Sequence, residues 1–464
     1  MKNIKLEEFN KSLKDKNVAI LGLGVSNLPL IDYLYKYEAN ICLFDDKEYE
    51  KLDSNIVEKI DKYNLKYYLG ENSLSNLSGF DLIFRSPSIL PNRKELEKEA
   101  KRGCIITTEI EMLMKLIPSK IIGITGSDGK TTTTTLIYEC LKASGYNVFV
   151  GGNIGTPLFT KASEMNEDDI VVLELSSFQL MGMEVSPNIS VITNITPNHL
   201  NIHTDMDEYV LSKRRIIDSQ NNSDICVLNY NDEIVKNFSK YAKGEVRYFS
   251  RFDNISNGFC IKDNAIYRVI DSKYNKVIDI KDILLRGIHN YENICTCLSA
   301  IIDLIDIDKA IEVFKTFKGV EHRLEFVSEI NGVKWYNDSV SSSPTRTIAG
   351  LNSYDESIVL IAGGYDKHID YDVIGKPIVE KVSTLILMGD TKDKIYNATV
   401  KAEEKLNKKV DKYIVSSLKE AVDVALSKAK EKEVVLFSPA SASFDMFKNF
   451  ADRGEQFKDL VMKL

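Results

Sequence analysis

Residues 123–132 have the composition and spacing of a phosphate-binding loop. The segment reads GITGSDGKTT and lies between an apolar run and the start of a helical stretch. Glycines let backbone N–H groups close on phosphate oxygens, and a helix N-terminus adds positive potential. Lys130 is placed to reach the outer phosphates, and the Thr131 hydroxyl can bind Mg²⁺. The sequence therefore predicts ATP binding through Gly126, Ser127, Asp128, Gly129, Lys130, Thr131 and Thr132.

The spacing of this loop is unusual. A standard eight-residue phosphate loop would need glycine at position 124, where this chain has Ile124 between Gly123 and Gly126. A glycine-rich turn with a chance lysine is the alternative. The agreement of strand, loop, Gly-Lys-Thr and helix favours the phosphate loop.

A carboxylate that could hold Mg²⁺ follows the loop. Residues 170–173 are apolar, which predicts a buried strand, and Glu174 stands at its end. Ligands gather at the carboxyl ends of strands in open α/β sheets. An isolated glutamate at a strand end is more often solvated, but its place after the phosphate loop favours a metal ligand.

The N-terminal part holds a partial dinucleotide fingerprint. Gly22 and Gly24 are followed by Asn27 where a third glycine is usual, and Asp45 ends the next predicted strand. An NAD-dependent oxidoreductase is one interpretation, and a related pocket for UDP is the other. In the second case Asp45 would meet a ribose or base and Ser86 a pyrophosphate.

Three clusters combine histidine with amide or arginine side chains, and capping or turn chemistry would explain each cluster taken alone. Together they suggest nucleotide, metal and phosphate contacts. They are residues 194–201, 287–293 and 322–325. Lys213 lies in a basic helical run that is most simply a solvated face.

Three series of short apolar runs, separated by helical stretches, would position these residues. The pattern predicts an α/β chain of three domains: a Rossmann-like N-terminal domain, a central doubly wound ATPase-like domain and a Rossmann-like C-terminal domain. The predicted boundaries are 1–112, 113–319 and 320–464. The predicted strands are residues 17–23, 40–44, 81–84, 120–124, 147–150, 170–173, 190–193, 324–330, 333–336, 357–362, 384–388 and 433–437.

The bulk composition narrows the function. The 464 residues are 44% hydrophobic, enough to bury large cores, and carry a formal net charge of -8. That negative charge argues against general binding to nucleic acid or anionic membranes. Any anionic substrate must therefore be bound by positively charged side chains gathered at its site. The cysteines are scattered and odd in number, and no apolar run reaches the length of a membrane helix. We expect a cytoplasmic protein without membrane insertion.

Taken in order, these segments resemble the Mur ligase family along essentially the whole chain. The segments that carry the resemblance are residues 126–131, 151–155, 174–180, 438–445 and the stretch 447–454. The two C-terminal segments are typical of members that add D-glutamate to a UDP-linked sugar peptide.

The resemblance implies substrates, cofactors and site residues. The expected substrates are ATP, UDP-N-acetylmuramoyl-L-alanine and D-glutamate, used by a monomer with a pair of Mg²⁺ ions. Lys130, His199 and a carbamylated Lys213 would be catalytic, and Thr131, Glu174, His199 and Lys213 would serve the metal. Asn290, Asn293, Arg323 and Asp338 would contact ATP; Ser26, Asp45, Ser86 and Asn153 the UDP substrate; and Ser342, Lys367, Ser443 and Phe450 D-glutamate.

Two segments depart from the family pattern. Residues 340–343 read VSSS where many relatives have Lys-Ala-Thr-Asn, and Tyr365 interrupts the usual Asp-Gly-Lys loop. A folate-type or different muramyl ligase and a non-catalytic nucleotide sensor are the remaining alternatives. The expected reaction phosphorylates a carboxylate with ATP, after which an amine attacks the acyl phosphate.

Overall fold

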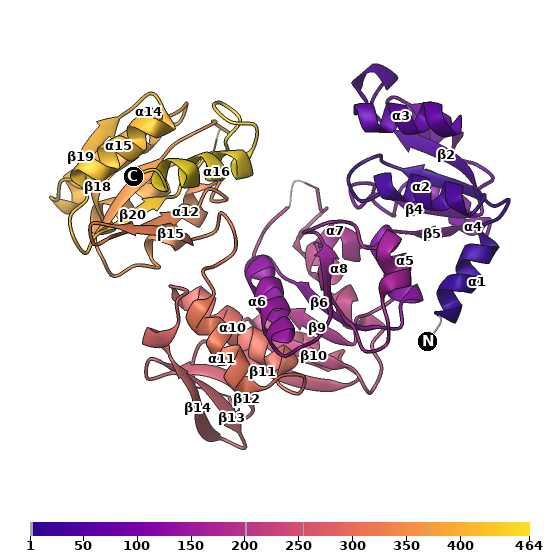
Figure 1. Ribbon diagram of the computed structural model, residues 1–464, viewed down its shortest axis with the longest axis horizontal. Helices are drawn as coiled ribbons and strands as arrows, with labels where there is room; N and C mark the ends of the chain where they lie inside the picture. The colour runs from indigo at the N-terminus through magenta and orange to yellow at the C-terminus, as the bar shows by residue number, and fades with distance from the viewer. Residues whose placement is uncertain (1–2, 200–201, 254, 368) are drawn as a thin grey trace. The chain divides into compact units, whose positions relative to one another are not determined.

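The computed structural model describes residues 3–199, 202–253, 255–367 and 369–464 (Figure 1). The chain forms two compact units. The first comprises Met1–Ile280 with Glu292–Val313, and the second Lys281–Tyr291 with Phe314–Leu464. The first unit contains two sheets and the second contains one. The predicted boundaries at residues 112 and 319 stay predictions.

The N-terminal sheet is parallel, with the order β3-β2-β1-β4-β5. Its central strands are buried apolar runs, as a sheet covered by helices on both faces requires. The strands are β1 Asn17–Leu21, β2 Asn40–Asp45, β3 Lys66–Leu69, β4 Leu82–Arg85 and β5 Ile105–Thr107. The helices are α1 Ile4–Ser12, α2 Leu28–Lys36, α3 Ser54–Tyr63, α4 Lys94–Lys101 and α5 Glu109–Leu116.

The central sheet has the order β14-β13-β12-β11-β10-β9-β6-β8-β7. Its strands are β6 Lys120–Thr125, β7 Val148–Gly152, β8 Ile170–Glu174, β9 Ile189–Ile192, β10 Ile225–Asn229, β11 Glu245–Ser250, β12 Gly258–Lys262, β13 Ala265–Ile270 and β14 Lys273–Asp279. The helices that accompany it are α6 Lys130–Ala143, α7 Ser177–Leu180, α8 Met206–Asp218, α9 Glu233–Asn237, α10 Ile288–Ile301 and α11 Ile307–Thr316. Helix α6 packs against β6, β7 and β8, as Figure 1 shows.

One end of this sheet is not doubly wound. Strands β12, β13 and β14 pair antiparallel, with the polar alternation of a sheet that faces solvent on one side. The sequence analysis predicted no strand in this region, because its apolar runs are short and interrupted by charged residues.

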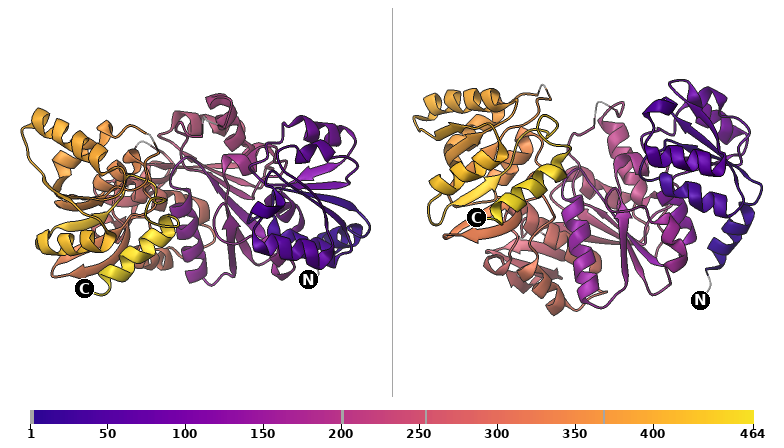
Figure 2. Two further views of the ribbon diagram at one scale, coloured as in Figure 1. Left: turned by 90° about the horizontal axis from the view of Figure 1, so that it is seen from above. Right: turned by 45° about the horizontal axis from the view of Figure 1, so that its top comes forward.

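The C-terminal sheet has the order β15-β16-β20-β17-β18-β19, with only β15 antiparallel to its neighbour. The strands are β15 Glu325–Ile330, β16 Val333–Asn337, β17 Ile358–Ala362, β18 Val382–Leu387, β19 Asp411–Ile414 and β20 Val434–Phe437. The helices are α12 Pro344–Leu351, α13 Gly375–Lys381, α14 Lys392–Leu406, α15 Leu418–Lys428 and α16 Phe450–Val461. Helix α16, yellow in Figure 2, packs on β15, β16 and α15.

The predicted strands are confirmed to within about two residues at their ends, which is the usual uncertainty of a boundary. All cysteines are free thiols, and all but the half-buried Cys104 are buried. Within the described ranges, no helix is long and apolar enough to span a bilayer.

Candidate functional site

The phosphate loop lies between β6 and α6, as predicted. Gly126 and Gly129 have φ angles of 148° and 81°, which favour glycine. A Cβ on Gly126 would lie 1.8 Å from Thr193 Oγ1, and one on Gly129 would lie 2.5 Å from Asn293 Oδ1. The Lys130 ammonium donates to the carbonyls of Gly126 and Ser127, at 2.9 and 3.0 Å. These close approaches explain why the loop needs glycine at both positions.

The end of the neighbouring strand β9 fixes the shape of the loop. Ser127 N donates to the Asn194 carbonyl at 2.9 Å, and Asp128 N donates to Asn194 Oδ1 at 2.9 Å. The Ser127 hydroxyl lies 2.9 Å from the Tyr209 hydroxyl of α8. The amide of Asn194 therefore acts on the loop itself, which gives the first of the histidine-amide clusters a positioning role.

Lys213 is not on a solvated face. Its side chain projects from α8 into the interior and is only 2% exposed. Its ammonium donates to the Gly126 carbonyl at 2.8 Å and lies 4.8 Å from the Tyr209 ring centroid. Burial, with a further contribution from the charge of Lys130, holds the pKa of Lys213 well below its usual value. The structure thus brings two lysines to the phosphate loop, and burial disfavours the charged form of Lys213.

Glu174 ends β8 inside the same site and is 1% exposed. Its Oε1 accepts a hydrogen bond from Asn153 Nδ2 at 2.9 Å. Its Oε2 is buried and has no hydrogen-bond partner among the described residues. A buried carboxylate oxygen without a partner is costly unless a ligand or cation completes it. This oxygen therefore fits a metal ligand, and Asn153, predicted for the UDP substrate, orients the carboxylate.

His199 and His203 flank Phe178. His199 is exposed, has a left-handed φ of 56°, and its ring centroid lies 5.3 Å from that of Phe178. His203 is buried and stacks on Phe178 with an interplanar angle of 7°. His203 Nε2 lies 3.0 Å from Ser177 Oγ, and Nδ1 lies 3.3 Å from Glu208. The sequence analysis assigned no role to His203, because only the fold places Ser177 against it.

The residues predicted for the UDP substrate make contacts that stabilise the turn after β1. A Cβ on Gly22 would lie 2.8 Å from Ser86 Cβ, so β1 and β4 end in close contact. Asp45 Oδ2 accepts from Leu23 N at 2.7 Å. The Asn27 amide donates to the carbonyls of Leu21 and Gly22, both at 3.0 Å. Asn27 thus stabilises the turn through its side-chain amide, and the neighbouring Ser26 is half-buried.

The residues predicted for D-glutamate follow the carboxyl ends of parallel strands in the second unit. Ser342 follows β16, Lys367 follows β17, and Ser443 follows β20. Ser443 is 2% exposed, while Phe450, at the start of α16, is 44% exposed. Because β16, β20 and β17 are adjacent, the loops after these strands lie at one edge of the sheet.

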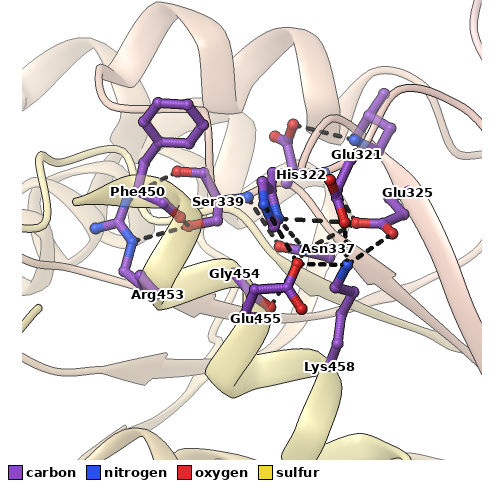
Figure 3. Close-up of polar contacts among 12 residues, drawn as sticks. Glu321, His322, Glu325, Asn337, Ser339, Phe450, Arg453, Gly454, Glu455 and Lys458 are labelled. Atoms are coloured by element: carbon purple, nitrogen blue, oxygen red, sulfur yellow. Dashed lines mark hydrogen bonds and ion pairs between the residues drawn. The ribbon is translucent and has the colours of Figure 1, made fainter. Parts of the chain in front are cut away.

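Arg323, predicted for ATP, lies in a constrained turn in this unit. Its neighbours His322 and Leu324 have left-handed φ angles of 62° and 43°. Asn337 Nδ2 lies 3.0 Å from His322 Nδ1 and donates to Glu325 Oε2 at 3.0 Å (Figure 3). Left-handed conformations of such residues persist only where surrounding contacts hold them. Asn337 supplies that support at His322, and the Asp338 carboxylate, which accepts from Leu324 N, supplies it at Leu324.

Asp338 lies behind the same turn and is 2% exposed. Its Oδ2 accepts from the Ser438 hydroxyl at 2.6 Å, and its Oδ1 accepts from Leu324 N at 3.3 Å. Burial raises the pKa of Asp338 to about 6, against the opposing effect of these hydrogen bonds and of Arg323. The carboxyl therefore stabilises the turn.

Helix α16 braces the turn from the other side. A Cβ on Gly454 would lie 2.2 Å from His322 Nδ1, so only glycine lets the histidine pack on the helix. Glu321, His322 and Glu455 could offer ligand atoms to a metal, within 4.8 Å of one another. The Lys458 ammonium already lies 2.6 and 2.8 Å from the two carboxylates, as Figure 3 shows. A lysine therefore supplies the positive charge at this position.

The two predicted asparagines of α10 belong to different compact units. Asn293 is in the first, where its Oδ1 lies 3.3 Å from the Thr133 hydroxyl of α6. Asn290 is in the second, where its amide donates to the Arg286 carbonyl at 2.7 Å. Asn293 is thereby placed against the phosphate loop.

Three family models match successive parts of the chain. Residues 16–108 match the MurD-like N-terminal domain of Mur ligases, residues 124–301 the Mur ligase middle domain, and residues 322–441 the Mur ligase glutamate ligase domain. The chain belongs to the Mur ligase family, whose members are ATP-dependent amide-bond-forming enzymes. This confirms the predicted family and the three-domain α/β fold.

Curated relatives are similar over almost their full length. A protein of Acetivibrio thermocellus is 48% identical over 99% of both chains, and one of Clostridium botulinum is 47% identical over 98% of this chain and 99% of its own. Both relatives are named UDP-N-acetylmuramoylalanine--D-glutamate ligase.

Solved structures share the fold at low identity. UDP-N-acetylmuramate-alanine ligase MurC from Thermotoga maritima has a TM-score of 0.59 at 18% identity, covering 97% of this chain and 99% of its own. MurF ligase from Thermotoga maritima, solved in complex with ADP, has a TM-score of 0.55 at 18% identity, covering 98% and 97%.

Proposed function

We propose that this chain is an ATP-dependent ligase that joins D-glutamate to the carboxyl group of UDP-N-acetylmuramoyl-L-alanine and releases ADP and phosphate. The observation that carries the proposal is the phosphate loop, where Lys130 and Lys213 stand beside the buried, half-satisfied carboxylate of Glu174. The choice of substrates follows the names of the relatives at 47–48% identity.

The reaction has two chemical steps. A carboxylate oxygen of the UDP-linked substrate attacks the γ-phosphorus of ATP, and ADP leaves with the bridging oxygen. The amine of D-glutamate then attacks the acyl carbon, an amide bond forms, and phosphate leaves while the nitrogen loses a proton. The Lys130 ammonium neutralises charge that builds on the transferred phosphoryl group.

Mg²⁺ fits this site through the unpartnered Oε2 of Glu174, with the Thr131 hydroxyl and His199 as further ligands. When bound, it would neutralise phosphate charge. Asn153 holds the Glu174 carboxylate by its other oxygen.

Lys213 is proposed to carry a carbamate. The neutral amine, favoured by the lowered pKa, attacks CO₂ and loses a proton, which turns a cation into an anion. A carbamate anion at this buried position would attract the Lys130 ammonium, whereas a charged Lys213 amine would repel it. The carbamate would join Glu174 as a ligand for a pair of Mg²⁺ ions.

The remaining assignments extend the same proposal. The match to a MurD-like N-terminal domain favours a UDP-linked substrate over a dinucleotide at the Gly22 turn. Ser26, Asp45 and Ser86 would line that site, and Asn290, Asn293, Arg323 and Asp338 would contact ATP. Ser342, Lys367, Ser443 and Phe450 would hold D-glutamate. We further propose a cytoplasmic monomer that binds no nucleic acid.

Phosphate release tests this function directly. The assay supplies ATP, Mg²⁺ and UDP-N-acetylmuramoyl-L-alanine, and compares D-glutamate with L-glutamate, L-alanine and meso-diaminopimelate. Release should require the UDP-linked substrate and D-glutamate together. Lys130→Ala should reduce kcat on the order of 10³-fold, because a cationic phosphoryl contact is lost.

Lys142→Ala is the matched control, since Lys142 is an exposed lysine on the same helix. It should keep wild-type turnover. Near-normal turnover in Lys130→Ala, or a preference for another amino acid, would contradict the proposal.

A further inference from the structure

We propose that Arg453 is a positioning residue for the amino-acid substrate: its buried guanidinium ties together the strand-end loops that carry the residues assigned to D-glutamate. This inference rests on the proposed function, because it concerns the same amino-acid site. It gives a role to a residue that lies beneath the site rather than in it.

Arg453 lies in the first turns of α16 and is 0% exposed. Its Nε donates to Ser339 Oγ at 3.0 Å, and one terminal nitrogen donates to the Ser339 carbonyl at 2.7 Å. The other terminal nitrogen donates to the carbonyls of Ser441 and Ala442, at 3.1 and 2.9 Å. Figure 3 shows the contacts between Arg453 and Ser339. One planar group thereby fixes two loops to one helix.

The two loops are those that follow β16 and β20. Ser339 lies three residues before Ser342, and Ala442 directly precedes Ser443. The Ser339 hydroxyl also donates to the Phe450 carbonyl at 2.8 Å. Three of the four residues assigned to D-glutamate therefore depend on segments bonded to Arg453 or to its partner Ser339.

The fourth residue is reached through a shared acceptor. The Ala442 carbonyl accepts from Tyr365 N at 2.9 Å as well as from Arg453. Tyr365 belongs to the loop after β17 that leads to Lys367. Gly364 permits this approach, since a Cβ there would lie 2.3 Å from the Ala442 carbonyl oxygen. Arg453 thus bonds the loops of Ser342 and Ser443 directly and is linked to the loop of Lys367 through the Ala442 carbonyl.

The charge of Arg453 is not cancelled by a bonded carboxylate. Each of these four hydrogen bonds ends on a neutral oxygen. Burial lowers the pKa of Arg453 to about 10, with Asp445 and Asp338 opposing that effect, so the group stays protonated at neutral pH. Its positive charge therefore remains beneath loops that we expect to receive a dicarboxylic amino acid, and it favours an anionic ligand.

A residue with this role should affect one substrate more than the others. Loosening the loops would misplace several D-glutamate contacts at once, whereas the UDP-linked substrate is assigned to the N-terminal sheet. A general loss of folding would instead lower the amount of active enzyme, and so kcat, without a selective change in KM.

Steady-state kinetics of the full chain test the inference. Arg453→Met keeps much of the side-chain volume but removes the charge and every donor. It should raise the KM for D-glutamate about tenfold or more, because small displacements of positioning groups have large effects. The KM for UDP-N-acetylmuramoyl-L-alanine should stay near the wild-type value. Arg453→Lys keeps the charge without the planar fork, and an intermediate KM is expected.

Arg85→Met is the matched control, because Arg85 is another buried arginine that donates to carbonyls, those of Ile89 and Met181. It should leave the KM for D-glutamate near the wild-type value. Equal increases in that KM for Arg85→Met and Arg453→Met would overturn the inference.

Ser339→Ala decides the question if Arg453→Met does not fold. This variant removes one acceptor of Arg453 and the bond to Phe450, and a smaller selective increase in the D-glutamate KM is expected. An unchanged KM in Ser339→Ala, or in folded Arg453→Met, would contradict the inference. A failure of the proposed function is distinct, because wild-type enzyme would then show no D-glutamate-dependent phosphate release.

Discussion

The phosphate loop of the first unit and the strand-end loops of the second differ in how they use buried charge. At the phosphate loop, Glu174 Oε2 has no partner among the described residues, and burial disfavours the charged form of Lys213. Beneath the strand-end loops, Arg453 donates to three protein carbonyls and a hydroxyl. A buried charge that is incompletely satisfied is available for chemistry, whereas a satisfied one holds structure.

After Lys130→Ala, the largest effect is expected at Lys213, which lies at the phosphate loop beside the incompletely satisfied Glu174. Lys213→Ala should lower kcat about 10- to 100-fold, because the variant lacks the group that we propose orients the metal or phosphate. Added formate or acetate should restore part of the activity by supplying a carboxylate. Phosphate-release kinetics with and without these salts measure both effects.

Arg215→Ala serves as the control, since Arg215 is an exposed cation in the same basic run. It should behave as the wild type. Full activity of Lys213→Ala would mean that the buried amine at this loop has no catalytic role.

A smaller effect is expected at Gly454, which follows Arg453 in α16 of the second unit, where the buried charge has hydrogen-bond partners. Gly454→Ala places a methyl group against His322 and should shift the turn that carries Arg323. Overpacking of this kind costs about 1–3 kcal/mol, so the midpoint of thermal unfolding should fall. The KM for ATP should rise as well. Gln456→Ala, at an exposed position of the same helix, should change neither quantity, and equal behaviour of the two variants would contradict the bracing role.

The smallest effect is expected at Glu109, a satisfied buried carboxyl in the first unit. Its side chain accepts from Phe159 N at 2.6 Å, and burial raises its pKa from 4.5 to about 7. The folded state therefore binds this proton more tightly than the unfolded state. Its contribution to stability is fully present below about pH 4.5 and is lost as the pH rises to about 7.

Glu109→Gln should remove that loss, since the amide oxygen can still accept from Phe159. The variant should gain on the order of 1 kcal/mol relative to wild type between about pH 5 and pH 8. Thermal unfolding at several pH values measures the difference. Glu71→Gln, at an exposed glutamate, should show no such trend. A stability difference between Glu109→Gln and wild type that does not change with pH would show that ionisation of Glu109 does not destabilise the folded state.

The sequence predicted those parts of the molecule whose determinants are local. Most of the buried parallel strands are continuous apolar runs, and the phosphate loop is a contiguous pattern, so both could be located without a structure, although the buried parallel strand β10 was not predicted. The antiparallel strands β12–β14 were missed because charged residues interrupt their apolar positions.

Roles that depend on distant partners could not be predicted. His203 acquires its place from Ser177, and Arg453 from Ser339, which is 114 residues away in the chain. The sequence analysis singled out the segment around Arg453 by resemblance but gave this side chain no function. Asn337 was likewise given no role, because its importance lies in contacts to His322 and Glu325, which are distant in the chain.

The burial of the thiols has a consequence for how the enzyme tolerates oxidants. Burial raises the pKa of Cys42, Cys104 and Cys260 to about 11 and that of Cys226 to about 12, so little thiolate forms at neutral pH. The thiolate is the form that peroxides and alkylating agents attack. Ligase activity should therefore survive mild oxidative stress, and alkylation of the buried Cys42, Cys226 or Cys260 would report that the chain has opened.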